Sequence, residues 1–247
     1  MERLCTIESI QRECIKGECC FTIQKSIGIG GFSSTYNACI KDICNYALKW
    51  NSTKRQRETK TQTEMRVEIQ YQQRAAEIGI SIPIYEIIIC DGGYGFIMDK
   101  LDITLSDILK EVKNIKEKIS ILALLIRIVK KLHAANITHN DLHEYNIMRK
   151  GDVYYLIDFG EATELDEEKR QTDMCSLIRI FLTKTTSAII DDLDYKRGYH
   201  INIDIIKQNI KDPDDDIILK TFIELLQSIE KDTSDKNIDS ILQKYIV

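Results

Sequence analysis

The sequence predicts an α+β protein, with a small antiparallel sheet and one long helix toward the amino terminus and mainly helices toward the carboxy terminus. Three observations carry this prediction. Up to residue 98, short alternating or apolar runs are bounded by glycines, which is typical of strands joined by turns. Residues 52–79 interrupt these runs with one long stretch of helical spacing. Beyond residue 104, apolar residues recur mostly at helical spacing.

The size and composition of the chain are those of a globular protein. Its 247 residues can bury a full core as one large domain or two lobes, and 43% of them are hydrophobic. The net charge of -5 argues against general nucleic-acid binding. No apolar run approaches the length of a membrane span, and the first residues form no apolar signal region. We expect a cytoplasmic monomer with no membrane attachment and no general affinity for nucleic acids, although local basic patches are not excluded by the net charge.

The eight cysteines include no CxxC pair and have no neighbouring histidines at zinc-finger spacing. We expect them to be reduced and partly buried thiols, as in cytosolic proteins. A metal cluster at Cys14, Cys19 and Cys20 is the alternative.

A glycine-rich loop follows the first predicted strand, Cys20–Ile27, and precedes a second strand, Ser34–Ile40. Gly28, Gly30 and Gly31 let the backbone turn tightly and point its amides at phosphate groups. A Walker loop would end in Gly-Lys-Ser/Thr, which is absent, and a Rossmann turn would open a helix rather than a strand. The loop is therefore a phosphate-binding candidate of a different kind.

A lysine interrupts the apolar strand Asn45–Trp50 at position 49. An inward-facing Lys49 is costly unless it pairs with a carboxylate or an anionic ligand. The long helix offers Glu64 and Glu68, four residues apart, and either can turn toward the lysine. The residues expected to pack this helix are Val67, Tyr71, Ala75 and Ile78.

The remaining elements are predicted from the same two periodicities. Two further strands are expected at Ile80–Cys90 and Gly95–Met98, and two short ones begin at Asn146 and Val153 and form a hairpin. Helices are expected at Leu105–Glu111, Asn114–Ala135 and Asp173–Leu182, with further helical patterns at 203–210, 216–230 and 236–245.

The strongest chemical signal is the stretch His139–Met148, with the sequence His-Asn-Asp-Leu-His-Glu-Tyr-Asn-Ile-Met, which is followed by Asp-Phe-Gly at residues 158–160. Asp141 supplies a carboxylate that can orient a hydroxyl nucleophile and accept its proton. Asn146 and Asp158 supply the hard oxygen ligands that divalent ions require. Their order and spacing indicate phosphoryl transfer from Mg-ATP.

Together these motifs resemble the protein kinase fold from about Ser26 to Leu182. The Gly-Gly-Phe of the loop and the run Glu68–Ala76 are similar to the casein kinase 1 and vaccinia-related kinase group. The resemblance implies a compact, bilobal, protein-kinase-like catalytic domain. The small size and the AT-rich type of composition fit a viral source, for which the expected location is the host cell cytoplasm or the virion. The implied division is a single domain at 1–247, with an N-lobe at 1–98, a hinge at 99–102 and a C-lobe at 103–247.

The resemblance also implies roles for individual residues. Asp141 is the catalytic base, and Lys49 positions the phosphates while Glu68 orients it, with Glu64 as the other candidate. Asn146 and Asp158 hold the magnesium ions. The residues implied to bind ATP are Ile27, Gly28, Gly30, Gly31, Phe32, Lys49, Met98, Asp99, Leu101, Asn146 and Asp158.

Several positions depart from the family pattern. Asn140 replaces an arginine that usually receives a phosphorylated activation loop, which favours activity without such phosphorylation. His143 replaces a lysine at the γ-phosphate and is either a weaker catalytic substitute or a structural side chain. Ser33 and Thr35 replace a glycine and a valine in the glycine-rich loop. The segment from Gly160 to Asp173 is short and has no Ala-Pro-Glu.

Asp173 resembles the family's aspartate that holds the catalytic loop by backbone hydrogen bonds, and a simple helix N-cap is the other interpretation. From all of this we expect a serine/threonine protein kinase that transfers the γ-phosphate of Mg-ATP to protein hydroxyls. His143 and the short segment favour, as the alternative, a small-molecule phosphotransferase of the aminoglycoside or choline kinase type. A non-catalytic pseudokinase scaffold is the third hypothesis.

Overall fold

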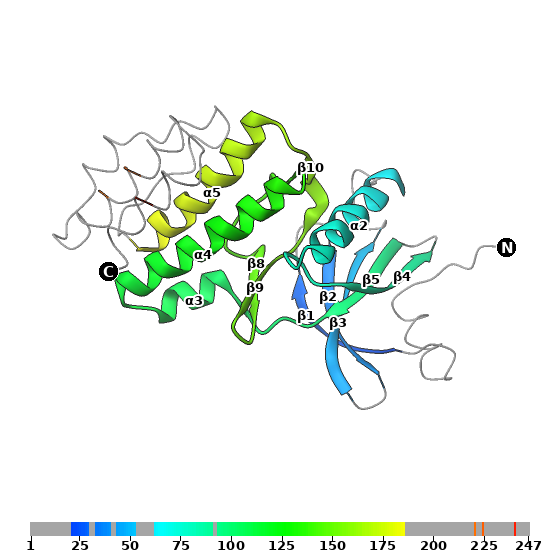
Figure 1. Cartoon of the computed structure of the whole chain (residues 1–247). Coiled ribbons are helices and arrows are strands. Elements are labelled where there is room, and N and C mark those ends of the chain that lie inside the picture. The colour runs from blue at the N-terminus through cyan, green and yellow to red at the C-terminus, as the bar shows by residue number, and fades with distance from the viewer. Residues whose placement is uncertain are drawn as a thin grey trace. The chain divides into compact units, whose positions relative to one another are not determined.

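The computed structural model describes residues 21–29, 33–40, 43–52, 62–90 and 93–185, and the single positions 220, 224 and 240. These residues fall into two compact units. The first contains the described chain up to Asp102 together with Ile157–Gly160, and the second contains Ile103–Leu156 and the described chain from Glu161 onward. A sheet with one helix forms the first unit, whereas helices dominate the second (Figure 1). The predicted α+β class is confirmed.

A five-stranded sheet is the basis of the first unit. Its strands are β1 (Thr22–Ile29), β2 (Ser33–Ile40), β3 (Ile43–Ser52), β4 (Ile84–Cys90) and β5 (Gly93–Asp99). Their order is β1-β2-β3-β5-β4, and every neighbouring pair is antiparallel. The strand that carries Lys49, β3, is thus the central one.

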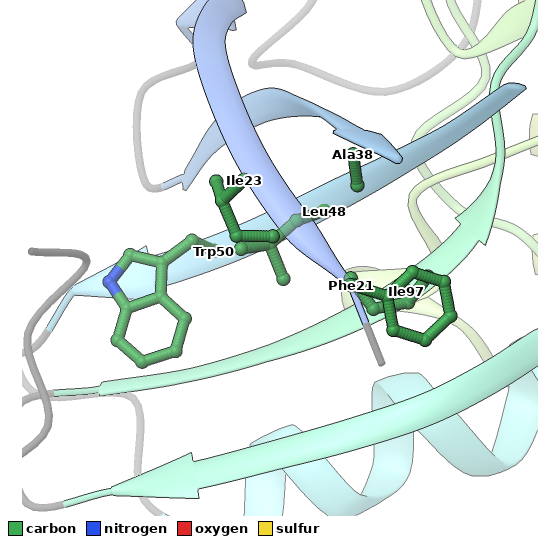
Figure 2. Close-up of a cluster of buried hydrophobic side chains, with 6 residues drawn as sticks. All are labelled: Phe21, Ile23, Ala38, Leu48, Trp50 and Ile97. Carbon is green, nitrogen blue, oxygen red and sulfur yellow. The ribbon is translucent and has the colours of Figure 1, made fainter. Parts of the chain in front are cut away.

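Alternation along β3 separates two kinds of side chain. Leu48 and Trp50 belong to an apolar cluster on one face of the sheet, so Lys49 between them points to the other face. The cluster, shown in Figure 2, consists of Phe21, Ile23, Ala38, Leu48, Trp50 and Ile97. A slip of one residue would turn the lysine into this cluster, so burial of the apolar face fixes the register of β3.

Gly95 lies opposite Trp50 on β5, where the strands approach too closely for a side chain. A Cβ there would lie 2.6 Å from the Lys49 carbonyl oxygen and 2.7 Å from the Trp50 ring. We expect Gly95→Ala to lower the free energy of unfolding by about 1–3 kcal/mol, because the backbone or the indole must shift. Urea denaturation measures this loss. Gly28→Ala is the control, since its Cβ would come no closer than 3.7 Å to Thr35, and an equal loss in both variants would contradict the steric explanation.

The helix α2 (Gln62–Glu77) is followed by Gly79, whose φ of 71° is in the left-handed region that closes helices. Three of the four predicted packing residues are only partly buried, namely Val67, Tyr71 and Ile78. The most buried residues of the helix are Ala75, as predicted, and Glu68, Ile69 and Gln72, which were not among the predicted packing residues. The predicted packing face consisted of apolar residues alone. It left out Gln72 and also Glu68, which was expected only as the partner of Lys49, and both of these buried polar side chains have hydrogen-bond partners inside the unit.

Helices and short strands form the second unit. In chain order they are β6 (Ile103–Thr104), α3 (Leu105–Glu111), α4 (Ile115–Ala134), β7 (Ile137–Thr138), β8 (Ile147–Lys150), β9 (Val153–Leu156), β10 (Thr163–Glu164) and α5 (Glu167–Thr185). The Thr104 and Asn114 side chains accept backbone hydrogen bonds at the starts of α3 and α4, as N-caps do. The expected hairpin is β8–β9, which β6 extends, and β7 pairs with β10.

The boundaries of three elements differ most from the prediction. The predicted long helix began at Ser52, but this residue ends β3, and residues 53–61 lie outside the described chain. β4 begins at Ile84 rather than Ile80, because Pro83 cannot donate to a strand ladder. α5 begins at Glu167 rather than Asp173, since its first turns are polar and show no apolar stripe. Of the helical patterns predicted beyond residue 203, only positions 220, 224 and 240 are described, and each of them is helical.

Cys39 and Cys44 form a disulfide with their Cα atoms 4.0 Å apart, so the prediction of reduced thiols is wrong for these two. They flank the Ile40–Ile43 pair at the end of the β2–β3 pairing, which brings their side chains together. Disulfides are rare in the cytosol, and the cytoplasmic location stays a prediction.

The alternative metal cluster at Cys14, Cys19 and Cys20 lies outside the described residues. Within those residues, no helix is long and apolar enough to cross a membrane.

Candidate active site

Lys49 is the centre of a buried charged cluster in the first unit. Its Nζ lies 2.6 Å from Glu68 Oε1 on α2 and 2.7 Å from Asp158 Oδ1. Burial alone would lower the pKa of Lys49, but the two carboxylates outweigh it and hold the pKa above its ordinary value. The ammonium group therefore keeps its positive charge. The Phe96 ring, directly across from Lys49 on β5, lies 6.0 Å from Nζ.

Glu68 is the carboxylate that the structure pairs with Lys49, out of the two that the sequence offered. Its side chain is 2% exposed, and both of its oxygens accept hydrogen bonds. Lys49 donates to Oε1, and the Tyr94 hydroxyl donates to Oε2 at 3.1 Å. The side chain of Glu64 lies outside the described residues. Tyr94 was not predicted, although its alternation with Phe96 along β5 places it on the face that carries Lys49.

Asp158 reaches Lys49 from a backbone in an unusual conformation. Its φ is 64°, in the left-handed region that aspartate tolerates better than most residues. Phe159 beside it is fully buried. The Asp158 side chain is 41% exposed, so its carboxylate can contact both Lys49 and a ligand from solvent.

In the second unit, Asp141 and Asn146 lie together in the loop between β7 and β8. The Asn146 amide nitrogen donates to the Asp141 carbonyl oxygen at 2.9 Å and to its carboxylate Oδ2 at 3.2 Å. His143 Nε2 lies 3.7 Å from the same carboxylate oxygen. His143 Nδ1 accepts the Tyr145 backbone N–H at 3.2 Å, so in the neutral ring the proton is on Nε2, facing Asp141.

The loop is held from beneath by Asp173, which is fully buried in α5. Its two carboxylate oxygens accept the backbone N–H groups of His139 and Asn140, each at 2.8 Å. His133 Nε2 on α4 lies 2.9 Å from Oδ2. The expected bonds from Asp173 to the loop are confirmed, and the N-cap interpretation is wrong because Asp173 lies in the second turn of α5. His133 was missed, since nothing in its local sequence distinguishes it from a packed helix residue.

A polar clamp holds the segment that follows Asp-Phe-Gly. Its members are Asn136, Thr138 and Asn140. The Asn140 amide nitrogen donates to the Glu161 carbonyl oxygen at 2.8 Å and to the Thr163 hydroxyl at 3.0 Å. The Thr138 hydroxyl lies 3.1 Å from that of Thr163, and Asn136 donates to the Glu164 carboxylate. β7 and β10 share only two residue pairs, which is marginal for isolated strands, so these side-chain bonds support the pairing.

One comparison with known families bears on this site. A family model described as protein kinase domain matches residues 21–179. The chain belongs to the protein kinase domain family. The matched span contains every described residue of the charged cluster, the loop and the clamp. No curated protein matches the chain.

The other residues predicted to bind ATP lie on or after two strands of the first unit, or outside the described chain. Ile27 and Gly28 lie near the end of β1, Met98 and Asp99 end β5, and Leu101 is buried shortly after it, whereas Gly30, Gly31 and Phe32 lie outside the described residues. Asp99 Oδ1 accepts the Tyr85 hydroxyl at 3.1 Å. Partial burial and this bond raise the pKa of Tyr85 to about 12.

The polar clamp of this kinase can be tested by one isosteric change. Asn140→Asp has no N–H to donate and places a carboxylate against the Glu161 carbonyl, so we expect a loss of about 1–3 kcal/mol in the free energy of unfolding. Hydrogen exchange should become faster at residues 161–164. Asn114→Asp is the matched control, because there the side-chain oxygen accepts the Lys116 and Glu117 amides and aspartate preserves this. Unchanged exchange in Asn140→Asp would contradict the clamp.

Proposed function

We propose that this kinase domain transfers the γ-phosphate of Mg-ATP to serine and threonine hydroxyls of proteins. One observation carries the proposal. Lys49, on the central strand, keeps its charge between the Glu68 and Asp158 carboxylates at 2.6 and 2.7 Å. A buried cation held ready in this way is suited to binding phosphate oxygens.

The first unit would hold the nucleotide. Glu68 fixes the position of the Lys49 ammonium, which can then bind phosphate oxygens without reorganising. Gly28, near the end of β1, leads into the loop expected to place backbone amides over the phosphates. Bound Mg-ATP would supply the phosphoryl group, and its Mg²⁺ would neutralise negative charge on the phosphates.

The second unit would prepare the acceptor. Asp141 orients the acceptor hydroxyl and takes its proton during transfer. Asn146 holds the Asp141 carboxylate through its amide nitrogen at 3.2 Å. His143, with its proton on Nε2, can donate to an oxygen near Asp141 without competing for the acceptor's proton.

The candidate magnesium ligands fit the ion in their chemistry. Among the described residues, no group of three or more His, Cys, Asp or Glu side chains is arranged to hold a metal. Mg²⁺ in nucleotide sites is usually held by one or two protein oxygens and by substrate phosphates, so such a group is not required. Asp158 offers a carboxylate that is 41% exposed. The Asn146 amide nitrogen is engaged with Asp141, which leaves its Oδ1 as the ligand atom.

Turnover of radiolabelled ATP tests the proposal. Casein-like and histone-like proteins are offered beside small cationic acceptors, and phosphoamino-acid analysis identifies the labelled residue. We expect label on serine or threonine that is lost on adding EDTA and in Asp158→Ala. Transfer to proteins that survives in Asp158→Ala would contradict the assigned roles. Label on small acceptors alone would favour the small-molecule phosphotransferase, for which the position of His143 3.7 Å from Asp141 is the supporting observation.

A further inference from the structure

The Tyr94 hydroxyl is one of two donors to the Glu68 carboxylate. Tyr94 is 6% exposed and Glu68 is 1% exposed, so their bond lies away from solvent. The oxygens are divided between the donors, with Oε1 bonded to Lys49 at 2.6 Å and Oε2 to Tyr94 at 3.1 Å. Such hydrogen bonds to a buried charge are stronger than those between neutral groups.

Glu68 shares the Lys49 ammonium group with a second carboxylate. The single ammonium group also binds Asp158 at 2.7 Å, so two carboxylates share one cation. A carboxylate held at one oxygen only can rotate about its Cγ–Cδ bond and carry its partner with it. A second donor at the other oxygen removes this freedom.

The sheet makes Tyr94 a rigid donor. On β5 it is paired with Asn51 of β3 on one side and with Ile89 of β4 on the other. Its ring emerges on the same face as Phe96, which lies directly across from Lys49. One strand thus supplies both the apolar wall beside the lysine and the hydroxyl that holds the glutamate.

We propose that Tyr94 is a positioning residue for phosphoryl transfer, whose hydroxyl fixes the Glu68 carboxylate and thereby aims Lys49 at the nucleotide phosphates. This inference rests on the proposed function. Tyr94 acts through Glu68 and Lys49 and is not itself expected to touch the substrate.

A double-mutant cycle tests this role. Tyr94→Phe removes one hydroxyl, and Glu68→Ala removes the group through which it acts, with Glu68→Met, which has no oxygen acceptor, in its place if the alanine variant does not fold. We expect Tyr94→Phe to lower kcat/KM for Mg-ATP about tenfold, the scale of a lost hydrogen bond to a charged group. In the Glu68→Ala background, the same change should have little further effect.

Tyr154→Phe is the matched control, because it removes another hydroxyl from a tyrosine that is 7% exposed, on β9 of the second unit. If a tyrosine has only a structural role, loss of its hydroxyl lowers the melting temperature but leaves kcat/KM unchanged at assay temperatures well below the melting temperature. We therefore expect both tyrosine variants to lose some thermal stability and only Tyr94→Phe to lose kcat/KM. Wild-type kcat/KM in Tyr94→Phe, or losses that add fully with Glu68→Ala, would overturn the inference.

The two proposals can fail separately. Absence of phosphoryl transfer by the wild-type protein would refute the proposed function. The cycle is then run on the affinity for Mg-ATP, measured by titration calorimetry, and the same non-additive weakening is expected. If Tyr94→Phe binds Mg-ATP as the wild type does, or if the wild type binds none, the inference also fails.

Discussion

Asp141→Asn is expected to lower kcat about 10²–10⁴-fold, because an amide cannot accept the proton of the acceptor hydroxyl. The KM for ATP should stay close to that of the wild type, since Lys49 and Glu68 are unchanged. The loop should also keep its shape. Asn146 donates to the backbone carbonyl of residue 141 at 2.9 Å, and this bond does not depend on the side chain. Steady-state kinetics with radiolabelled ATP measures both constants.

Asp166→Asn is the matched control for this experiment. The Asp166 side chain is 49% exposed, and its Oδ1 accepts the Lys169 backbone N–H at 2.8 Å, which asparagine can also do. We expect wild-type kinetics from this variant. If Asp141→Asn lost activity only through a higher KM, or not at all, Asp141 would not be the base.

Lys49→Met is expected to have two large effects of different origin. It removes the charge that positions the phosphates, so kcat/KM should fall about 10²–10³-fold. It also leaves the Glu68 carboxylate buried without its cation, which should cost about 3–5 kcal/mol in the free energy of unfolding. Urea denaturation and radiolabelled turnover measure the two losses separately.

The double variant Lys49→Met/Glu68→Gln separates these effects. With a neutral amide at position 68, no buried carboxylate is left there without a cation, so much of the lost free energy of unfolding should return. Activity should not return, because the phosphates still lack their cation. Recovery of turnover together with stability would show that Lys49 serves only to neutralise Glu68.

The charged cluster could be predicted from the sequence only in part. A lysine inside an apolar strand requires a carboxylate, and this requirement pointed correctly to the long helix. The residues alone did not distinguish Glu64 from Glu68; the resemblance to kinases favoured the second. Tyr94 could not be predicted, because a strand tyrosine looks the same whether its hydroxyl meets water or a glutamate 26 residues away.

Two features were predicted wrongly because local sequence patterns do not report them. The start of α5 was missed because hydrophobic periodicity detects a buried face, and the first turns of this helix have none. The Cys39–Cys44 bond was missed because cysteine counts and spacings say nothing about strand register. The pairing of β2 with β3 brings these two cysteines together, and that pairing is a property of the folded sheet.

The left-handed backbone at Asp158 has a counterpart at Asn136 and Asn140, where φ is 61° and 64°. At all three positions, backbone geometry restricts the acceptable amino acids mainly to glycine, asparagine and aspartate before any chemistry is considered. A saturation library selected only for folding should therefore already be depleted at these sites. Selecting the survivors for phosphoryl transfer would then show, at position 158, which of the three residues the reaction itself demands.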